Sequence, residues 1–146
     1  DAKFGAPRGL WADAEGLLVA DTMRGIVQRF RPDGTFVRDW ACPGGGVARP
    51  VAVAHRAGTV LVADRHDDEP LRAFGLDGVE RPLPVSLRTQ CRAVVGFAFD
   101  RVGRLLVLDH HGLRVVRARA DFEFDQVVVD LIEVQADPPR DADGPS

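Results

Sequence analysis

The residues best suited to chemistry in this chain are two adjacent histidines, His110 and His111. Neutral imidazole is a common zinc ligand, and a zinc ion can activate bound water or polarise a substrate. Neighbouring side chains on an extended chain point in opposite directions, so this pair is poorly placed to hold one ion. The pattern therefore favours a solvated turn, and we predict no metal at this position.

Two other segments invite a similar comparison. His66 is followed by Asp67, Asp68 and Glu69, an acidic run that lacks the full spacing of a calcium-binding loop. The glycines at 44–46 could cradle a phosphate, but no Lys-Ser or Lys-Thr pair follows them. We interpret the first segment as a charged turn and the second as a flexible connector. No Ser-His-Asp or Cys-His arrangement can be argued from spacing, so we predict no catalytic residues and no cofactor.

Three aspartates occur in nearly the same short phrase. Leu-Val-Ala-Asp ends at Asp21 and again at Asp64, and Leu-Val-Leu-Asp ends at Asp109. An aspartate at the end of a strand can accept hydrogen bonds from backbone N–H groups of the turn that follows. Because an active site needs only one copy of a residue, this repetition favours a structural role for all three.

The spacing of these aspartates, 43 and 45 residues, predicts the fold. A repeat in the low forties with short apolar runs between turns is typical of a β-propeller, in which each repeat forms one four-stranded blade. We predict an all-β, propeller-like chain with three consecutive antiparallel blades within residues 1–135. The blades are expected at about 5–42, 48–85 and 92–130, followed by a Pro/Asp-rich linker or tail at 136–146.

The second repeat has an unusual last strand, expected at 79–83. It contains Pro82, which has no backbone N–H and is tolerated only on an outer edge strand. The segments 43–49 and 86–92 are expected to be loops between blades. Loops of this kind and the turns after each second strand lie on one face of a propeller, which makes that face the candidate binding surface. Its candidate residues are Met23, Arg24, Arg65, His66, His110 and His111.

Residues 7–30 carry a resemblance to a known family. They read Pro-Arg-Gly, an apolar strand, Asp-x-x-Gly at 13–16, Val-Ala-Asp-Thr at 19–22, and a strand ending in Phe30. This order resembles the NHL repeat, although Arg24 and Ile26 stand where the family has Asn and Arg. The resemblance covers about residues 5–129. It implies a propeller that closes with about six blades and that mediates protein–protein contacts, with RNA bound in some members through basic faces.

Composition narrows the expected partners. The 146 residues carry 19 basic and 22 acidic side chains, a net charge of −3, which argues against nucleic acid. No apolar stretch is long enough to cross a bilayer, so no membrane partner is expected. Lys3 is the only lysine beside eighteen arginines, a bias that suggests a GC-rich, bacterial genome. Cys42 and Cys91 are expected to be free thiols, and with no visible leader segment this favours the cytoplasm.

Three blades are half of a six-bladed propeller. We expect the chain to be part of a longer polypeptide that supplies the remaining blades, or, if it is complete, to associate with a copy of itself. The predicted function is a non-enzymatic binding or structural module that makes protein–protein contacts in a larger polypeptide or assembly, such as a phage-tail-like machine. The alternative is a metal-dependent propeller enzyme of the lactonase or lyase kind. That enzyme would need His or carboxylate ligands pointing into the channel from several blades.

Overall fold

The computed structural model of the chain describes residues 3–44, 48–65 and 69–130, and these form three antiparallel four-stranded sheets. The first sheet contains β1 (Pro7–Asp13), β2 (Gly16–Asp21), β3 (Ile26–Phe30) and β4 (Phe36–Ala41). The second contains β5 (Pro50–Arg56), β6 (Thr59–Asp64), β7 (Leu71–Gly75) and β8 (Glu80–Arg81). The third contains β9 (Val94–Phe99), β10 (Leu105–Asp109), β11 (Arg114–Ala118) and β12 (Phe124–Asp130).

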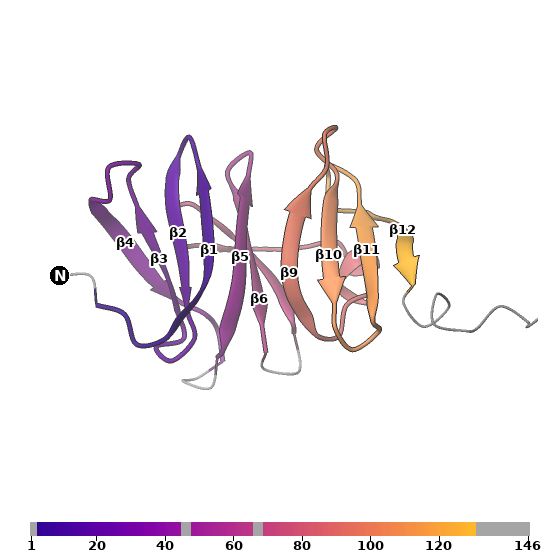
Figure 1. Cartoon of the computed structure of the whole chain (residues 1–146), viewed down its shortest axis with the longest axis horizontal. Coiled ribbons are helices and arrows are strands. Elements are labelled where there is room, and N and C mark those ends of the chain that lie inside the picture. The colour runs from indigo at the N-terminus through magenta and orange to yellow at the C-terminus, as the bar shows by residue number, and fades with distance from the viewer. Residues whose placement is uncertain (1–2, 45–47, 66–68, 131–146) are drawn as a thin grey trace, which may run out of the picture.

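Each sheet is one blade, in which every strand pairs with the next strand along the chain. The blades stand side by side as an arc, with the first strand of each blade, β1, β5 and β9, along its inner side (Figure 1). This is the arrangement of a β-propeller, so the predicted fold class is confirmed. No helix in the described part of the chain has the length and apolar character needed to span a membrane.

Glycine allows the close approaches that this arrangement needs. At Gly16, which begins β2, φ is +125° and a Cβ atom would lie 2.1 Å from the carbonyl oxygen of Phe30. At Gly9, a Cβ atom would lie 2.9 Å from the Cα of Ala52. Gly9 therefore lets the inner strands of the first two blades come together, and Gly16 permits the tight turn between β1 and β2.

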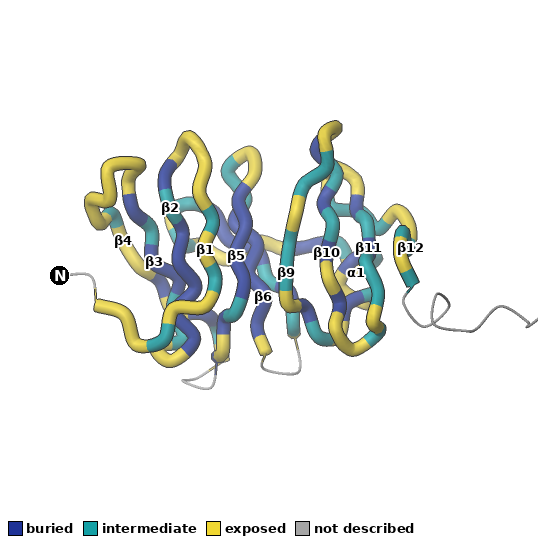
Figure 2. Tube along the Cα trace, viewed as in Figure 1, coloured by how far each residue is buried: buried dark blue, intermediate teal, exposed yellow. Residues whose placement is uncertain are grey.

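The middle blade is buried on both of its faces. We call the face that a blade turns toward the preceding blade its leading face, and the opposite one its trailing face. In β6, Val60 and Val62 lie on the leading face, Leu61 and Ala63 lie on the trailing face, and all four are 0% exposed. The dark blue of β5 and β6 in Figure 2 shows this burial. A strand buried on both sides needs a continuous apolar run rather than alternation, which is what β6 has.

Two apolar cores separate the three blades. The core between the first and second blades includes Leu18, Ala20, Val27, Trp40, Val53, Val62 and Phe74. The core between the second and third blades includes Leu61, Ala63, Leu71, Leu87, Leu105, Val107 and Val116. Burying one such aliphatic or aromatic side chain stabilises the fold by about 1.5–3 kcal/mol.

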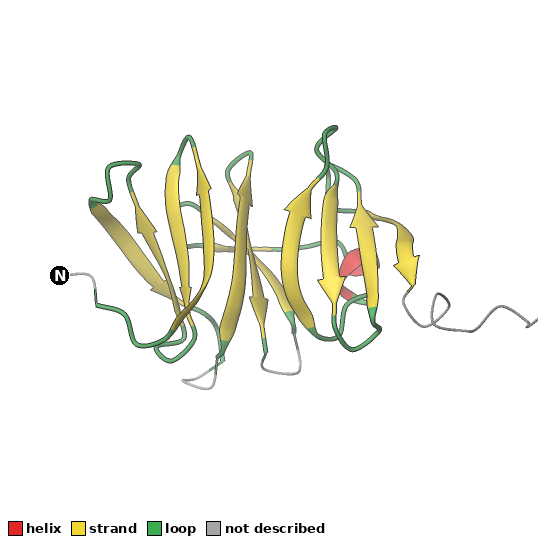
Figure 3. Ribbon diagram, in the orientation of Figure 1, coloured by secondary structure: helices red, strands yellow, loops and turns green. Residues whose placement is uncertain are grey.

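Two details of the second blade differ from the sequence-based expectation. Its outer strand, expected at 79–83, is only Glu80–Arg81, which pairs with Phe74 and Ala73. The chain then passes Pro82 and Pro84, which lack the N–H groups that a longer ladder would need. The expected loop at 86–92 begins as a single helical turn, α1 (Val85–Arg88), drawn in red in Figure 3. Leu87 in this turn is fully buried, so the helix fills the core that a longer outer strand would have covered.

Candidate functional site

The three repeated aspartates fasten the chain just before each blade begins. The Asp21 carboxylate accepts hydrogen bonds from the N–H groups of Gly5 (2.7 Å), Ala6 (2.9 Å) and Arg24 (3.3 Å). Asp64 accepts one from the N–H of Arg49. Arg24 lies in the turn after the aspartate, where the sequence suggested the donors would be. Gly5, Ala6 and Arg49 lie before the first strand of the blade, where no donor was expected.

The same contact recurs in the third blade and is reinforced by the backbone. Asp109 accepts a hydrogen bond of 3.0 Å from the N–H of Ala93, and the N–H of His110 donates to the carbonyl of Ala93 at 2.9 Å. Thr22 and Arg65 donate their N–H groups in the same way to Ala6 and Arg49. We call this pair of contacts the aspartate clamp. It joins the entrance of the first strand to the exit of the second.

Asp21 is adapted to this role as a carboxylate. Burial alone would raise its pKa, but the hydrogen bonds from Ala6, Gly5 and Arg24, together with the Arg24 charge, outweigh burial and lower it below 3.8. Asp21, Asp64 and Asp109 are 0–2% exposed. In Asp21 both carboxylate oxygens accept backbone N–H groups, so this side chain is suited to hold the fold together.

The loop face that was predicted for binding runs along the lower edge of the arc, where the chain turns after β2, β6 and β10 (Figure 1). Met23 is 69% exposed there, and Arg65, His110 and His111 are also exposed. Arg24 is turned back onto the chain and donates to the carbonyl of Lys3. His66 lies outside the described residues. Among the residues that the structure describes, no three His, Cys, Asp or Glu side chains are grouped to hold a metal ion.

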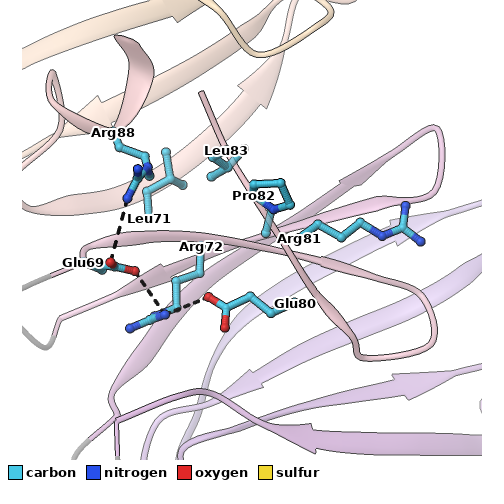
Figure 4. A pocket seen from close by; sticks show the side chains of 9 residues that line it. Glu69, Leu71, Arg72, Glu80, Arg81, Pro82, Leu83 and Arg88 are labelled. Atoms are coloured by element: carbon cyan, nitrogen blue, oxygen red, sulfur yellow. Dashed lines mark hydrogen bonds and ion pairs between the residues drawn. The ribbon is translucent and has the colours of Figure 1, made fainter. Parts of the chain in front are cut away.

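A pocket of about 170 Å³ opens where the outer strand of the second blade is short (Figure 4). Arg72 crosses it and pairs with Glu80 at 2.7 Å and with Glu69 at 3.1 Å, and Arg88 approaches Glu69 at 3.8 Å. Glu69, expected in a charged turn, is thus part of an ion-pair network. The two glutamates are thus engaged by Arg72 and Arg88, and Arg81 lines the same pocket as a third arginine.

A second, larger pocket of about 410 Å³ lies at the ends of the inner strands β1, β5 and β9 that are far from the loop face. There the rings of Trp11 on β1 and Phe99 on β9 meet edge to face, with centroids 5.8 Å apart, and the Arg56 guanidinium lies 5.3 Å from the Phe99 centroid. Trp11 and Phe99 thus form a contact between the first and third blades. Sequence reasoning missed it, because only the curvature of the arc brings these residues together.

His55 in this second pocket is the most buried histidine among the described residues, but both of its ring nitrogens are engaged. Its Nδ1 lies 2.6 Å from a carboxylate oxygen of Asp13, and its Nε2 accepts a hydrogen bond of 3.2 Å from the N–H of Gly58. Both ring nitrogens are thus taken up by neighbouring groups of the protein. A histidine in this state has no free lone pair to accept a proton from a substrate, so the arrangement joins two blades and does not form a general base.

Both cysteines are free and buried. Burial, reinforced by the nearby charges of Asp64 and Asp109 respectively, raises the pKa of Cys42 and of Cys91 to about 12. Because the thiolate is the reactive form, neither thiol should react with Ellman's reagent in the native protein at mildly alkaline pH. Both should react once guanidinium unfolds the chain, and fast labelling of either thiol without denaturant would contradict their burial.

The two ends of the arc expose apolar side chains. On the trailing face of the third blade, Leu108 is 42% exposed and Val129 is 40% exposed. On the leading face of the first blade, Leu10 is 68% exposed and Phe36 is 41% exposed. The internal faces of the same blades are closed by the two cores, so the described part of the chain has one exposed apolar face at each end.

These features define a β-propeller fold, and comparison with known proteins agrees. The chain is similar to virginiamycin B lyase from Staphylococcus aureus, with a TM-score of 0.61 and 16% identity over 83% of this chain and 40% of that one. It is also similar to a streptogramin B lyase, with a TM-score of 0.63 and 11% identity over 86% and 41% of the two chains. The computationally designed protein Ika4 aligns with a TM-score of 0.60 and 14% identity over 89% and 74%.

At these identities the likeness establishes the fold alone. The chain spans about two fifths of the length of the two lyases. No protein-family model matches the sequence, and no curated protein sequence matches it. The propeller fold that the NHL resemblance implied is therefore confirmed, whereas membership of that family is not confirmed.

Proposed function

We propose that the chain is a non-enzymatic propeller module that works by making protein–protein contacts at its two open blade faces. The observation that supports this most directly is the composition of β10. Leu105 and Val107 lie on its leading face and are 0% exposed, whereas Leu106 and Leu108 point to the opposite, open face. β10 is thus as apolar as the buried β6 of the middle blade. Repeat arrays that end in water have polar outer faces, and this one does not.

The loop face provides a second surface for the same function. Met23, Arg65, His110 and His111 lie exposed there, and an exposed methionine suits a protein partner. A net charge of −3 favours protein over nucleic acid as that partner. We place the module in a larger polypeptide or assembly, of which a phage-tail-like machine is one example, and in the cytoplasm.

A photo-crosslinking amino acid placed at position 108 tests the proposal. In the cell that makes the protein, a crosslinker replacing Leu108 should yield a covalent adduct with protein, because the open face is covered there. The control replaces Val102, which is 70% exposed in the turn between β9 and β10 and lies on neither end face. An adduct at position 102 but none at position 108 would contradict the proposal.

The alternative function is a lyase-like enzyme, which the similarity to the two lyases favours. One of these similar structures is a catalytically inactive histidine-to-alanine variant of virginiamycin B lyase with quinupristin. We expect intact quinupristin to persist, by liquid chromatography, when incubated with this chain and divalent metal. Loss of quinupristin that depends on His110 or His111 would favour the enzyme over the non-enzymatic module. Stoichiometric zinc in the purified protein would do the same.

A further inference from the structure

The open face of the third blade is built like the face that the first blade turns toward the second. In the first blade, Ala20 pairs with Val27 and Val27 pairs with Trp40, and all three lie in the core. In the third blade, Leu108 pairs with Val115 and Val115 pairs with Val129. Leu108 and Val115 match Ala20 and Val27 when the clamp aspartates are aligned, and Val129 matches Trp40 through the strand pairing. The trailing face of the third blade is therefore the surface of an interblade junction.

The chain also carries the other half of such a junction. In the second blade, Val53 pairs with Val62 on the leading face that the first blade covers. Leu10 pairs with Val19 at the same positions of the first blade. Leu17 pairs with Phe30 there, just as Val60 pairs with Phe74 in the second blade. The leading face of the first blade thus matches the leading face of the second blade, which packs on the trailing face of the first.

An aromatic pair shows how the two halves complement each other. At the internal junction, Trp40 packs on Phe74 with ring centroids 6.0 Å apart and an interplanar angle of 47°. On the open leading face, Phe4 packs on Phe30 at 6.0 Å and 49°. Phe4 therefore takes the place that an outer-strand tryptophan takes elsewhere. In the third blade that outer-strand position holds the smaller Val129, which leaves room for Phe4.

The segment that carries Phe4 is fixed to the first blade. The side chain of Gln28 donates a hydrogen bond of 3.0 Å to the carbonyl of Lys3, and Asp21 holds the N–H of Gly5 at 2.7 Å. Phe4 nevertheless stays 51% exposed, and Leu10 on the same face is 68% exposed. The leading face is thus a preformed apolar surface that includes its own aromatic residue.

We propose, on the basis of the function proposed above, that two copies of this chain associate head to tail. The trailing face of each third blade covers the leading face of the other copy's first blade. Two arcs of three blades then close a ring of six, within the range of about four to eight blades that closed propellers have. Each junction joins two different faces, and a two-fold axis relates the second junction to the first, so the ring closes with two copies.

Sedimentation of the purified 146-residue chain tests this proposal. The wild-type protein should have twice the mass of one chain. Leu108→Asp and Leu10→Arg should each give a folded monomer, because each places a charge in both junctions of the ring. Both residues are exposed in the single chain, so the circular dichroism spectrum should be retained. Val102→Asp, the control in an exposed turn, should remain a dimer.

Mixing the two variants identifies the polarity of the contact. A heterodimer of Leu10→Arg and Leu108→Asp has one wild-type junction and one in which Arg meets Asp, so mixing the two monomers should restore the dimer. A monomeric wild type, a Leu108→Asp dimer or a mixture that stays monomeric would each overturn the head-to-tail ring. If the wild type is monomeric while the crosslinker at position 108 captures a different protein, the contact function stands and only this inference fails.

Discussion

Phe74→Ala is expected to lower the free energy of unfolding by about 3–5 kcal/mol, the usual loss when a buried phenylalanine is truncated. Phe74 is 1% exposed and lies in the core between the first and second blades, against Trp40. Two sheets that pack through their faces cannot easily close the cavity, because each blade is held as a unit by its own backbone ladder. The loss should therefore fall near the upper end of this range.

Urea unfolding followed by circular dichroism measures this loss. Val79→Ala is a suitable control, because Val79 is 61% exposed beside the turn that leads from β7 to β8. The control should change the free energy of unfolding little. Equal losses for the two variants would mean that the core between the first two blades contributes far less than its burial indicates.

Asp21→Ala is expected to cost about 3 kcal/mol, because it removes three hydrogen bonds to a buried carboxylate and each contributes about 0.5–1.5 kcal/mol. The substitution leaves the N–H groups of Gly5 and Ala6 without their acceptor and removes the hydrogen bond from Arg24 that supports the turn. Asp33→Ala is the matched control, since Asp33 also accepts a backbone N–H, that of Thr35 at 2.9 Å, but lies in an exposed turn. A loss at Asp33 as large as that at Asp21 would argue against the clamp.

The same aspartate should make stability depend on pH. Because the pKa of Asp21 in the folded chain is lowered below 3.8, its contribution is present above 3.8 and is lost as the pH falls through the folded-state pKa. Asp21→Asn should remove that part of the acid sensitivity. The measurement is the difference in unfolding free energy between wild type and Asp21→Asn, from neutral pH into the acid range. A difference that stays constant would show that Asp21 does not titrate differently on folding.

The repeat predicted the blades because the blade is a local unit. Each run ending in a clamp aspartate forms a second strand, and strands that follow one another in sequence pair with one another. Local signals were less informative at Pro82, where the backbone stops pairing earlier than the apolar pattern suggested. The helical turn at Val85–Arg88 was missed because four residues carry no helical period.

The candidate site was harder to anticipate, since its contacts join residues far apart in sequence. The turn-based argument anticipated the donor at Arg24, but Ala6 and Arg49 lie 15 residues before Asp21 and Asp64, on the far side of the first strand, and no local signal indicated them. The partner of His55 is Asp13 of another blade. The loop-face residues, by contrast, were placed from the repeat alone, because a position within a blade determines which edge it reaches.

The ring contact between Trp11 and Phe99 has a consequence for how the molecule comes apart. In a simple row of repeats, each unit touches only its immediate neighbours, so an end unit can fray while the others persist. Here, detachment of the third blade would also remove the contact of Phe99 with Trp11 in the first blade. The first and third blades are therefore coupled directly as well as through the middle blade. Melting should consequently be a single cooperative transition rather than a stepwise peeling from one end.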